Sequence, residues 1–315
     1  MHSHKGKCYL VGRVLAFTVA VAAAAGAADG PTGATPEVPA FRANGTLVLV
    51  PVTVIDRRGA IVNGLARDAF TLTEDGVRQQ LQAFSEEDAP VSMGIVLDLS
   101  GSMKGYLDAA KESLRSLMND ANPGDEAFLN AVSTSPRKYS GFTVDFDEIL
   151  QRVAFEGAGG DTALIDTVYG SLQELRSGVH ARKALLVISD GMDNHSRYSR
   201  QELLELAMES DAQVYTIAVG NVAAPFSKPI QQAEEKRGLL FLDELAQKTG
   251  GMSFIVRNRA DIRAAAASIG RALRNQYTIG YVPSGNGRSG QWRRIRVKVE
   301  GPGMTAYARS GYRLD

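Results

Sequence analysis

The stretch MGIVLDLSGSM, residues 93–103, decides the fold of this chain. It is apolar up to Asp98 and then presents two hydroxyls, Ser100 and Ser102. A run that is apolar on both faces is typical of a parallel strand covered by helices on both sides. In open α/β sheets, ligands bind beyond the carboxyl ends of the strands, where the strand order reverses. The stretch therefore predicts a central buried strand that carries three oxygen-bearing side chains to a ligand site.

Strands and helices alternate on either side of this stretch. Such alternation predicts an α/β fold with a doubly wound, mostly parallel sheet. The expected strands cover residues 125–132, 137–144, 183–189, 213–219 and 252–256. The expected helices cover residues 104–119, 145–153, 162–176, 199–210, 241–248 and 260–274, with a long connection at 220–238.

Two later stretches add oxygen ligands of the same kind. GGDTAL, residues 159–164, places Thr162 on a glycine-rich loop that opens a helix, and KALLVISDG, residues 183–191, is a second apolar strand that ends in Asp190. Hydroxyl and carboxylate oxygens are the ligands of hard cations such as Mg²⁺. Taken alone, the first motif has a plainer interpretation, a strand end followed by a serine helix cap.

The three motifs in this order resemble the metal-ion-dependent adhesion site of von Willebrand factor type A (VWA) domains, and the likeness covers residues 90–275. It implies direct contact of the metal with Ser100, Ser102 and Thr162, while Asp98 and Asp190 hold it largely through water. It also implies Mg²⁺, or Mn²⁺ or Ca²⁺ in its place, and a protein partner that offers a carboxylate. The whole chain resembles a bacterial VWA-related subgroup in which β segments flank the domain.

The flanking segments, residues 46–88 and 276–315, are rich in strand-forming residues. Asp75-Gly76 predicts a tight hairpin turn, and Pro51 predicts an edge strand or a bulge. The later segment predicts strands at 277–282, 292–300 and 304–312, the second with a basic face that we interpret as solvated. Because neither segment is large enough to fold alone, we expect them to pair into one small β unit.

The first 45 residues differ from the rest in composition. Residues 1–28 have a basic start, an apolar core and small residues near Ala27 and Ala28, which predicts a cleaved signal peptide. An uncleaved membrane anchor is the alternative, and only then is a membrane implied. Residues 29–45 have the proline and glycine content of a linker. The only cysteine, Cys8, lies in the leader, so we expect an exported protein without disulfides, in the periplasm, at the cell surface or outside the cell.

Charge and motifs exclude several functions. The chain has 35 basic and 35 acidic residues, so no net charge recruits nucleic acid or an anionic membrane. No phosphate-binding glycine loop indicates a nucleotide. A hydrolase using His195 with Ser100 or Ser102 is disfavoured because no G-x-S-x-G elbow surrounds either serine. Asp161, Asp193 and Asn194 are polar residues that could support the metal ligands.

We therefore expect a non-enzymatic, exported, metal-dependent protein-binding module of the adhesion type, with no catalytic residues. The alternative that the sequence leaves open is a structural cell-envelope protein whose metal stabilises loops.

Overall fold

The computed structural model describes residues 47–220, 229–284 and 288–314. The predicted leader, residues 1–28, and the predicted linker, residues 29–45, lie outside these ranges. Within the described ranges, none of the helices is both long enough and apolar enough to cross a membrane.

A six-stranded sheet forms the centre of the fold, with the order β10-β9-β8-β5-β6-β7. All neighbouring strands are parallel except β6 and β7, which are antiparallel. The strands are β5 (Val91–Asp98), β6 (Glu126–Val132), β7 (Arg137–Lys138), β8 (Arg182–Ser189), β9 (Ala212–Val219) and β10 (Ser253–Val256). Every residue of β5 is buried, as its apolar sequence predicts. The chain leaves β5 for β6 on one side and returns to β8 on the other, so the strand order reverses between β5 and β8.

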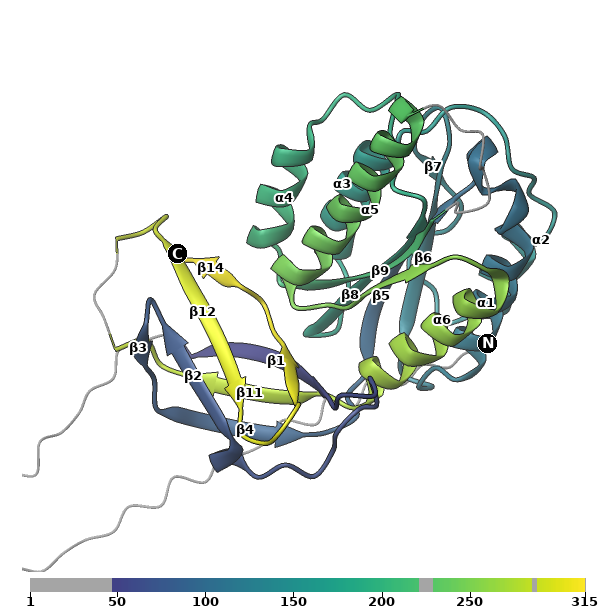
Figure 1. The fold of residues 1–315 in the computed structure, drawn as a ribbon. Helices are drawn as coiled ribbons and strands as arrows, with labels where there is room; N and C mark the ends of the chain where they lie inside the picture. The colour runs from purple at the N-terminus through teal and green to yellow at the C-terminus, as the bar shows by residue number, and fades with distance from the viewer. Residues whose placement is uncertain (1–46, 221–228, 285–287, 315) are drawn as a thin grey trace, which may run out of the picture. The chain divides into compact units, whose positions relative to one another are not determined.

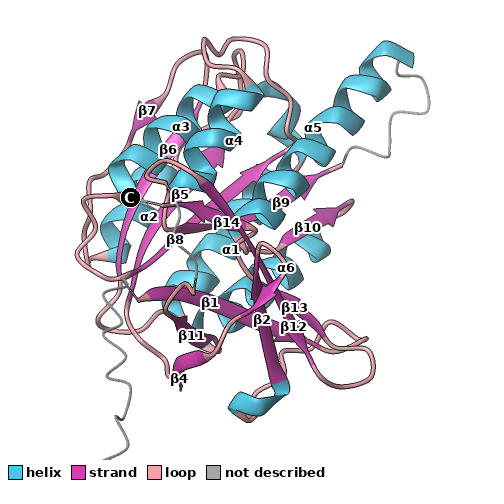
Figure 2. Ribbon diagram, turned by 90° about the vertical axis from the view of Figure 1, so that its left-hand side faces the viewer, coloured by secondary structure: helices cyan, strands magenta, loops and turns pink. Residues whose placement is uncertain are grey.

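Helices cover both faces of this sheet (Figures 1 and 2). Side chains of α1 (Leu107–Asn119), α2 (Phe146–Ala154) and α6 (Arg259–Arg274) pack on one face. Side chains of α3 (Leu164–Leu175), α4 (Arg200–Glu209) and α5 (Pro229–Thr249) pack on the other. The alternation within β5 divides these cores, because Ile95 and Leu97 belong to the first and Val96 to the second. The predicted doubly wound α/β fold is confirmed.

Helix α5 begins earlier than the sequence predicts. We expected a connection over residues 220–238, but the helix begins at Pro229 and runs unbroken to Thr249 (Figure 2). Proline is tolerated in the first turn of a helix, where its missing N–H has no helical partner. The helix passes through Gly238, where the expected connection ended. A side chain at this position would meet the backbone of Gly191, so the close approach of the two segments requires glycine.

Smaller differences concern the ends of elements. The helix expected from residue 104 starts at Leu107, after a 3-10 helix over Gly101–Gly105. The strand expected over residues 137–144 is only the two residues of β7, followed by an isolated bridge between Ala127 and Thr143. The two residues of β7 form the edge strand of the sheet, which pairs with β6.

The segments before and after the central domain form two four-stranded sheets, β13-β1-β11-β4 and β14-β12-β2-β3. Their strands are β1 (Val48–Ile55), β2 (Phe70–Glu74), β3 (Val77–Arg78), β4 (Leu81–Glu86), β11 (Tyr277–Tyr281), β12 (Trp292–Val299), β13 (Thr305–Tyr307) and β14 (Gly311–Arg313), and a 3-10 helix covers Arg67–Ala69. In both sheets an early strand pairs with a late one, because Val50 opposes Ile279 and Leu72 opposes Val297. Buried side chains from both sheets share one core.

Two details of these sheets follow from the backbone. Pro51 lies in a strand with two neighbouring strands, but β13 pairs only with Thr53–Ile55. Among the described residues, the second edge of β1 therefore has no sheet partner at Pro51. The single strand expected over residues 304–312 is two strands in different sheets. Between them the chain turns toward α5, where the Ser310 amide donates to the Lys248 carbonyl at 3.0 Å.

Candidate functional site

The turn after β5 brings two hydroxyls beside a buried acid. Asp98 is fully buried, and its Oδ1 accepts a hydrogen bond from the Ser100 amide at 2.8 Å. The hydroxyl oxygens of Ser100 and Ser102 lie 3.0 Å apart. Ser100 is buried while Ser102 is exposed, so the pair lies at the boundary between the protein interior and solvent.

A second acid follows β8, on the neighbouring strand. Asp190 is buried, and its Oδ1 accepts from the Met192 amide at 3.0 Å. Burial, and then the negative charge of Asp190, raises the pKa of Asp98 to about 6. The charge of Asp190 therefore opposes ionisation of Asp98, and a bound cation would relieve this repulsion.

Thr162 lies on the loop between α2 and α3, which hydrogen bonds connect to both other loops. Its amide donates to Asn194 Oδ1 at 2.9 Å, and the Asn194 amide donates back to the Thr162 carbonyl at 3.0 Å. Earlier in the same loop, the Gly159 amide donates to the Leu99 carbonyl at 2.7 Å. The five residues predicted as ligands thus lie at the carboxyl end of β5, which holds Asp98, and on three interconnected loops beyond the ends of the strands.

Sequence reasoning missed Ser189, which links Asp98 to the turn that carries Asp190. Its hydroxyl donates to Asp98 Oδ2 at 2.6 Å and accepts from the Gly191 amide at 3.0 Å. Ser189 is the last residue of β8 and fully buried. A polar residue that interrupts an apolar strand one position before an acid was the available signal.

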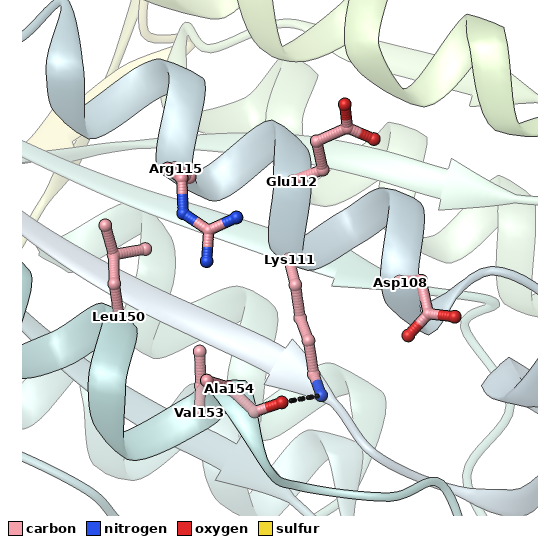
Figure 3. Close-up of a pocket in the computed structure, with 7 residues that line it drawn as sticks. All are labelled: Asp108, Lys111, Glu112, Arg115, Leu150, Val153 and Ala154. Carbon is pink, nitrogen blue, oxygen red and sulfur yellow. Dashed lines mark hydrogen bonds between the residues drawn. The ribbon is translucent and has the colours of Figure 1, made fainter.

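Lys111 of α1 is a second residue that the sequence did not single out. Its ammonium donates to the Ala154 carbonyl at 3.0 Å, which Figure 3 shows, and to the Glu156 carbonyl at 2.6 Å. It lines a hollow of about 200 Å³ between α1 and α2. These carbonyls lie where α2 passes into the loop that carries Thr162, so Lys111 connects α1 to the start of that loop. The other residues that line this hollow are Asp108, Glu112, Arg115, Leu150, Val153 and Ala154.

The donor set fits a hard divalent cation. Within the described ranges, no three His, Cys, Asp or Glu side chains gather as a metal site, so a cation here needs the hydroxyl oxygens as well. Serine, threonine and aspartate supply only oxygen, which suits Mg²⁺, Mn²⁺ or Ca²⁺ rather than a soft metal. The two buried acids place negative charge beside these hydroxyls, which attracts a cation.

The polar residues around the ligands have separate roles. Asn194 orients Thr162, and Asp193 Oδ1 accepts from the Ile165 amide at 3.2 Å, at the start of α3. His195 is half exposed, and its Nδ1 lies 4.0 Å from Asp161 Oδ2. The Ser100 hydroxyl is paired with Ser102, and no bond joins it to His195 in the described part of the chain. The geometry gives no support to a serine hydrolase.

Parts of this chain are similar to known proteins. The family profile described as "von Willebrand factor type A domain" matches residues 93–192. An uncharacterised protein of Borreliella burgdorferi is 24% identical over 188 residues, which are 52% of this chain and 53% of that protein. The chain thus spans about half the length of this curated relative.

Two solved structures are similar at low identity. A von Willebrand factor type A protein from Catenulispora acidiphila has a TM-score of 0.48 and 14% identity, covering 87% of this chain and 76% of its own. The von Willebrand factor domain of the type V pilus tip protein Mfa5 from Porphyromonas gingivalis has a TM-score of 0.46 and 13% identity, covering 59% of this chain and 95% of its own. The profile match identifies residues 93–192, which run from β5 to β8 of the six-stranded sheet, as part of a von Willebrand factor type A domain.

Proposed function

We propose that this chain is an exported protein-binding module of the adhesion type, which recognises an acidic group of a partner through a divalent cation. Ser100, Ser102 and Thr162 would hold the ion directly, and Asp98 and Asp190 would hold it largely through water. Mg²⁺ is the ion that we expect, with Mn²⁺ or Ca²⁺ as alternatives. The predicted signal peptide supports a location outside the cytoplasm.

The observation that carries the proposal is the meeting of two buried acids and a hydroxyl pair where the strand order reverses. Three neutral hydroxyls leave a divalent ion short of direct negative charge, and water between the ion and the acids weakens their compensation. An open coordination position on such an ion favours an anionic oxygen from outside. A carboxylate of a partner protein supplies it.

A purely structural metal is the second candidate, and the hydrogen bonds of the site argue against it. Hydrogen bonds between protein groups already connect the loops. They join Gly159 to Leu99, Thr162 to Asn194, and Ser189 to Asp98. A cation is therefore not needed to hold these loops in place. The half-exposed hydroxyl pair also leaves the ion within reach of a partner.

Capture of partners with and without metal tests the proposal. The full chain, immobilised, is exposed to surface and secreted proteins of the producing bacterium in Mg²⁺ or in EDTA. We expect specific proteins to bind only in Mg²⁺, and not to a Ser100→Ala/Ser102→Ala variant. Ser116→Ala, at an exposed position of α1, is the matched control. Proteins that bind equally in EDTA and to the double variant would contradict metal-dependent recognition.

A further inference from the structure

A second hollow lies directly beside the hydroxyl pair. It has a volume of about 410 Å³ and is lined by Ser102, Gly105, Tyr106, Arg257, Asn258 and Arg259. It lies between the 3-10 helix that follows β5 and the start of α6, and α1 and α6 run side by side on this face of the sheet (Figure 1). A proposed metal ligand and two arginines thus share one depression.

The hollow is basic, and its charged side chains have no ion-pair partner in the described ranges. Arg257 and Arg259 are exposed, and neither forms an ion pair with any described residue. Exposed Lys104, in the adjoining 3-10 helix, has no ion pair there either. Farther along α6, by contrast, Arg263 pairs with Glu112 at 2.9 Å and Arg274 with Asp125 at 2.6 Å. Arg271, also on α6 but outside the hollow, has no acidic partner among the described residues and donates instead to Ser268 Oγ at 3.0 Å. The arginines of the hollow differ in lying together beside a proposed metal ligand.

Hydrogen bonds position the guanidinium of Arg259 and the main chain of Arg257. The Arg259 Nε donates to the Gly105 carbonyl at 2.8 Å, which fixes the guanidinium against the 3-10 helix. The Tyr106 hydroxyl donates to the Arg257 carbonyl at 3.4 Å. Asp261, the acid in the first turn of α6, already accepts a hydrogen bond from Asn258 Nδ2 at 2.8 Å. A guanidinium that is held in place loses less conformational freedom when it binds a carboxylate through two hydrogen bonds.

We propose that this basic hollow binds a second carboxylate of the partner, so that the module recognises an acidic segment rather than a single acid. The inference rests on the proposed function, since the first carboxylate would coordinate the ion beside Ser102. Opposite charges across such a surface chiefly raise the association rate and select the correct partner, and salt screens them. A segment with neighbouring Asp or Glu residues is thus preferred over an isolated acid.

A peptide of defined charge tests the inference. The probe is a fluorescent, amidated hexaglutamate, compared with a hexapeptide that has one Glu among glycines, and binding to the full chain is followed by fluorescence anisotropy in Mg²⁺ at low salt. Arg257→Gln/Arg259→Gln should weaken hexaglutamate binding by at least about threefold, as loss of exposed charge pairs does. Binding of the one-Glu peptide and of Mg²⁺ should be unchanged. Arg271→Gln, on the same helix but outside the hollow, should bind hexaglutamate as the parent does.

Each other outcome overturns the inference in a way that separates it from the proposed function. If hexaglutamate requires Mg²⁺ but binds the double arginine variant normally, the hollow plays no part and metal-dependent recognition stands. If Arg271→Gln weakens binding equally, only overall charge matters. If the parent does not bind hexaglutamate, the inference that the hollow binds a second carboxylate is also rejected. Binding that persists in EDTA and in Ser100→Ala/Ser102→Ala would contradict the proposed function itself.

Discussion

The contact between Gly238 and Gly191 predicts that helix α5 sets the position of Asp190. A Cβ atom added at Gly238 would lie 2.5 Å from the Gly191 carbonyl oxygen. Ordinary contact begins at 3.4 Å, so the two backbones must separate by the difference, 0.9 Å. Gly191 directly follows Asp190 and has a φ of +76°, a backbone conformation that favours glycine. Gly238→Ala should therefore displace the Asp190 loop or push α5 away.

Two opposing energies determine the expected change in the stability of Gly238→Ala. Alanine is favoured over glycine inside a helix by about 1 kcal/mol, whereas overpacking a tight contact costs about 1–3 kcal/mol. The variant should thus be up to about 2 kcal/mol less stable than the parent, although the substitution favours the helix. Displacement of a residue that supports a metal site typically lowers affinity about tenfold or more, and we expect that loss for Mg²⁺.

Gly170→Ala is the matched control, because Gly170 is exposed inside α3 and a Cβ there would meet nothing within 4 Å. It should gain about 1 kcal/mol and keep the parental Mg²⁺ affinity. Urea unfolding in EDTA measures stability, and calorimetry measures Mg²⁺ binding. If Gly238→Ala is as stable as Gly170→Ala and binds Mg²⁺ like the parent, the glycine contact does not position Asp190.

Three further predictions concern the acids, the flanking strands and the leader. Because the pKa of Asp98 is raised to about 6, the folded metal-free protein holds this proton more tightly than the unfolded chain, and its stability should fall as pH rises from about 4 to about 6. In EDTA at pH 7, Asp98→Asn should therefore be more stable than the parent by up to about 3 kcal/mol, less about 1 kcal/mol for the weakened hydrogen bond from Ser189. Mg²⁺ should no longer stabilise the variant. Urea unfolding that finds the variant less stable than the parent in EDTA would refute this prediction. A chain shortened at Asn275 lacks β11, so β1 should lose its protection in hydrogen exchange, and retained protection would show that the flanking segments fold independently. Mass spectrometry of the native protein should find a start after Ala27 or Ala28, whereas an intact Met1 would indicate a retained anchor.

Structural features that depend on a few neighbouring residues could be predicted from the sequence. The buried strand β5, with Asp98 at its end, follows from a continuous apolar run. The hairpin between β2 and β3 follows from Asp75-Gly76, where both residues have positive φ. In each case neighbouring residues alone impose the backbone conformation.

Features that depend on distant residues could not be predicted. Gly238 resembles a break in α5 until the fold places it against Gly191. Ser189 acquires its role only because β8 lies beside β5, where its hydroxyl reaches Asp98. The basic hollow likewise joins Ser102 to Arg257 and Arg259, which only the packing of α6 brings together. A single sequence records none of these pairings.

Calorimetric titration of Mg²⁺ into the purified protein tests the central claim most directly. We predict one binding event per chain for the parent and for the control Ser116→Ala, and none for Ser100→Ala/Ser102→Ala. An unchanged Mg²⁺ affinity in the double variant would place the ion elsewhere and contradict metal-dependent recognition at this site.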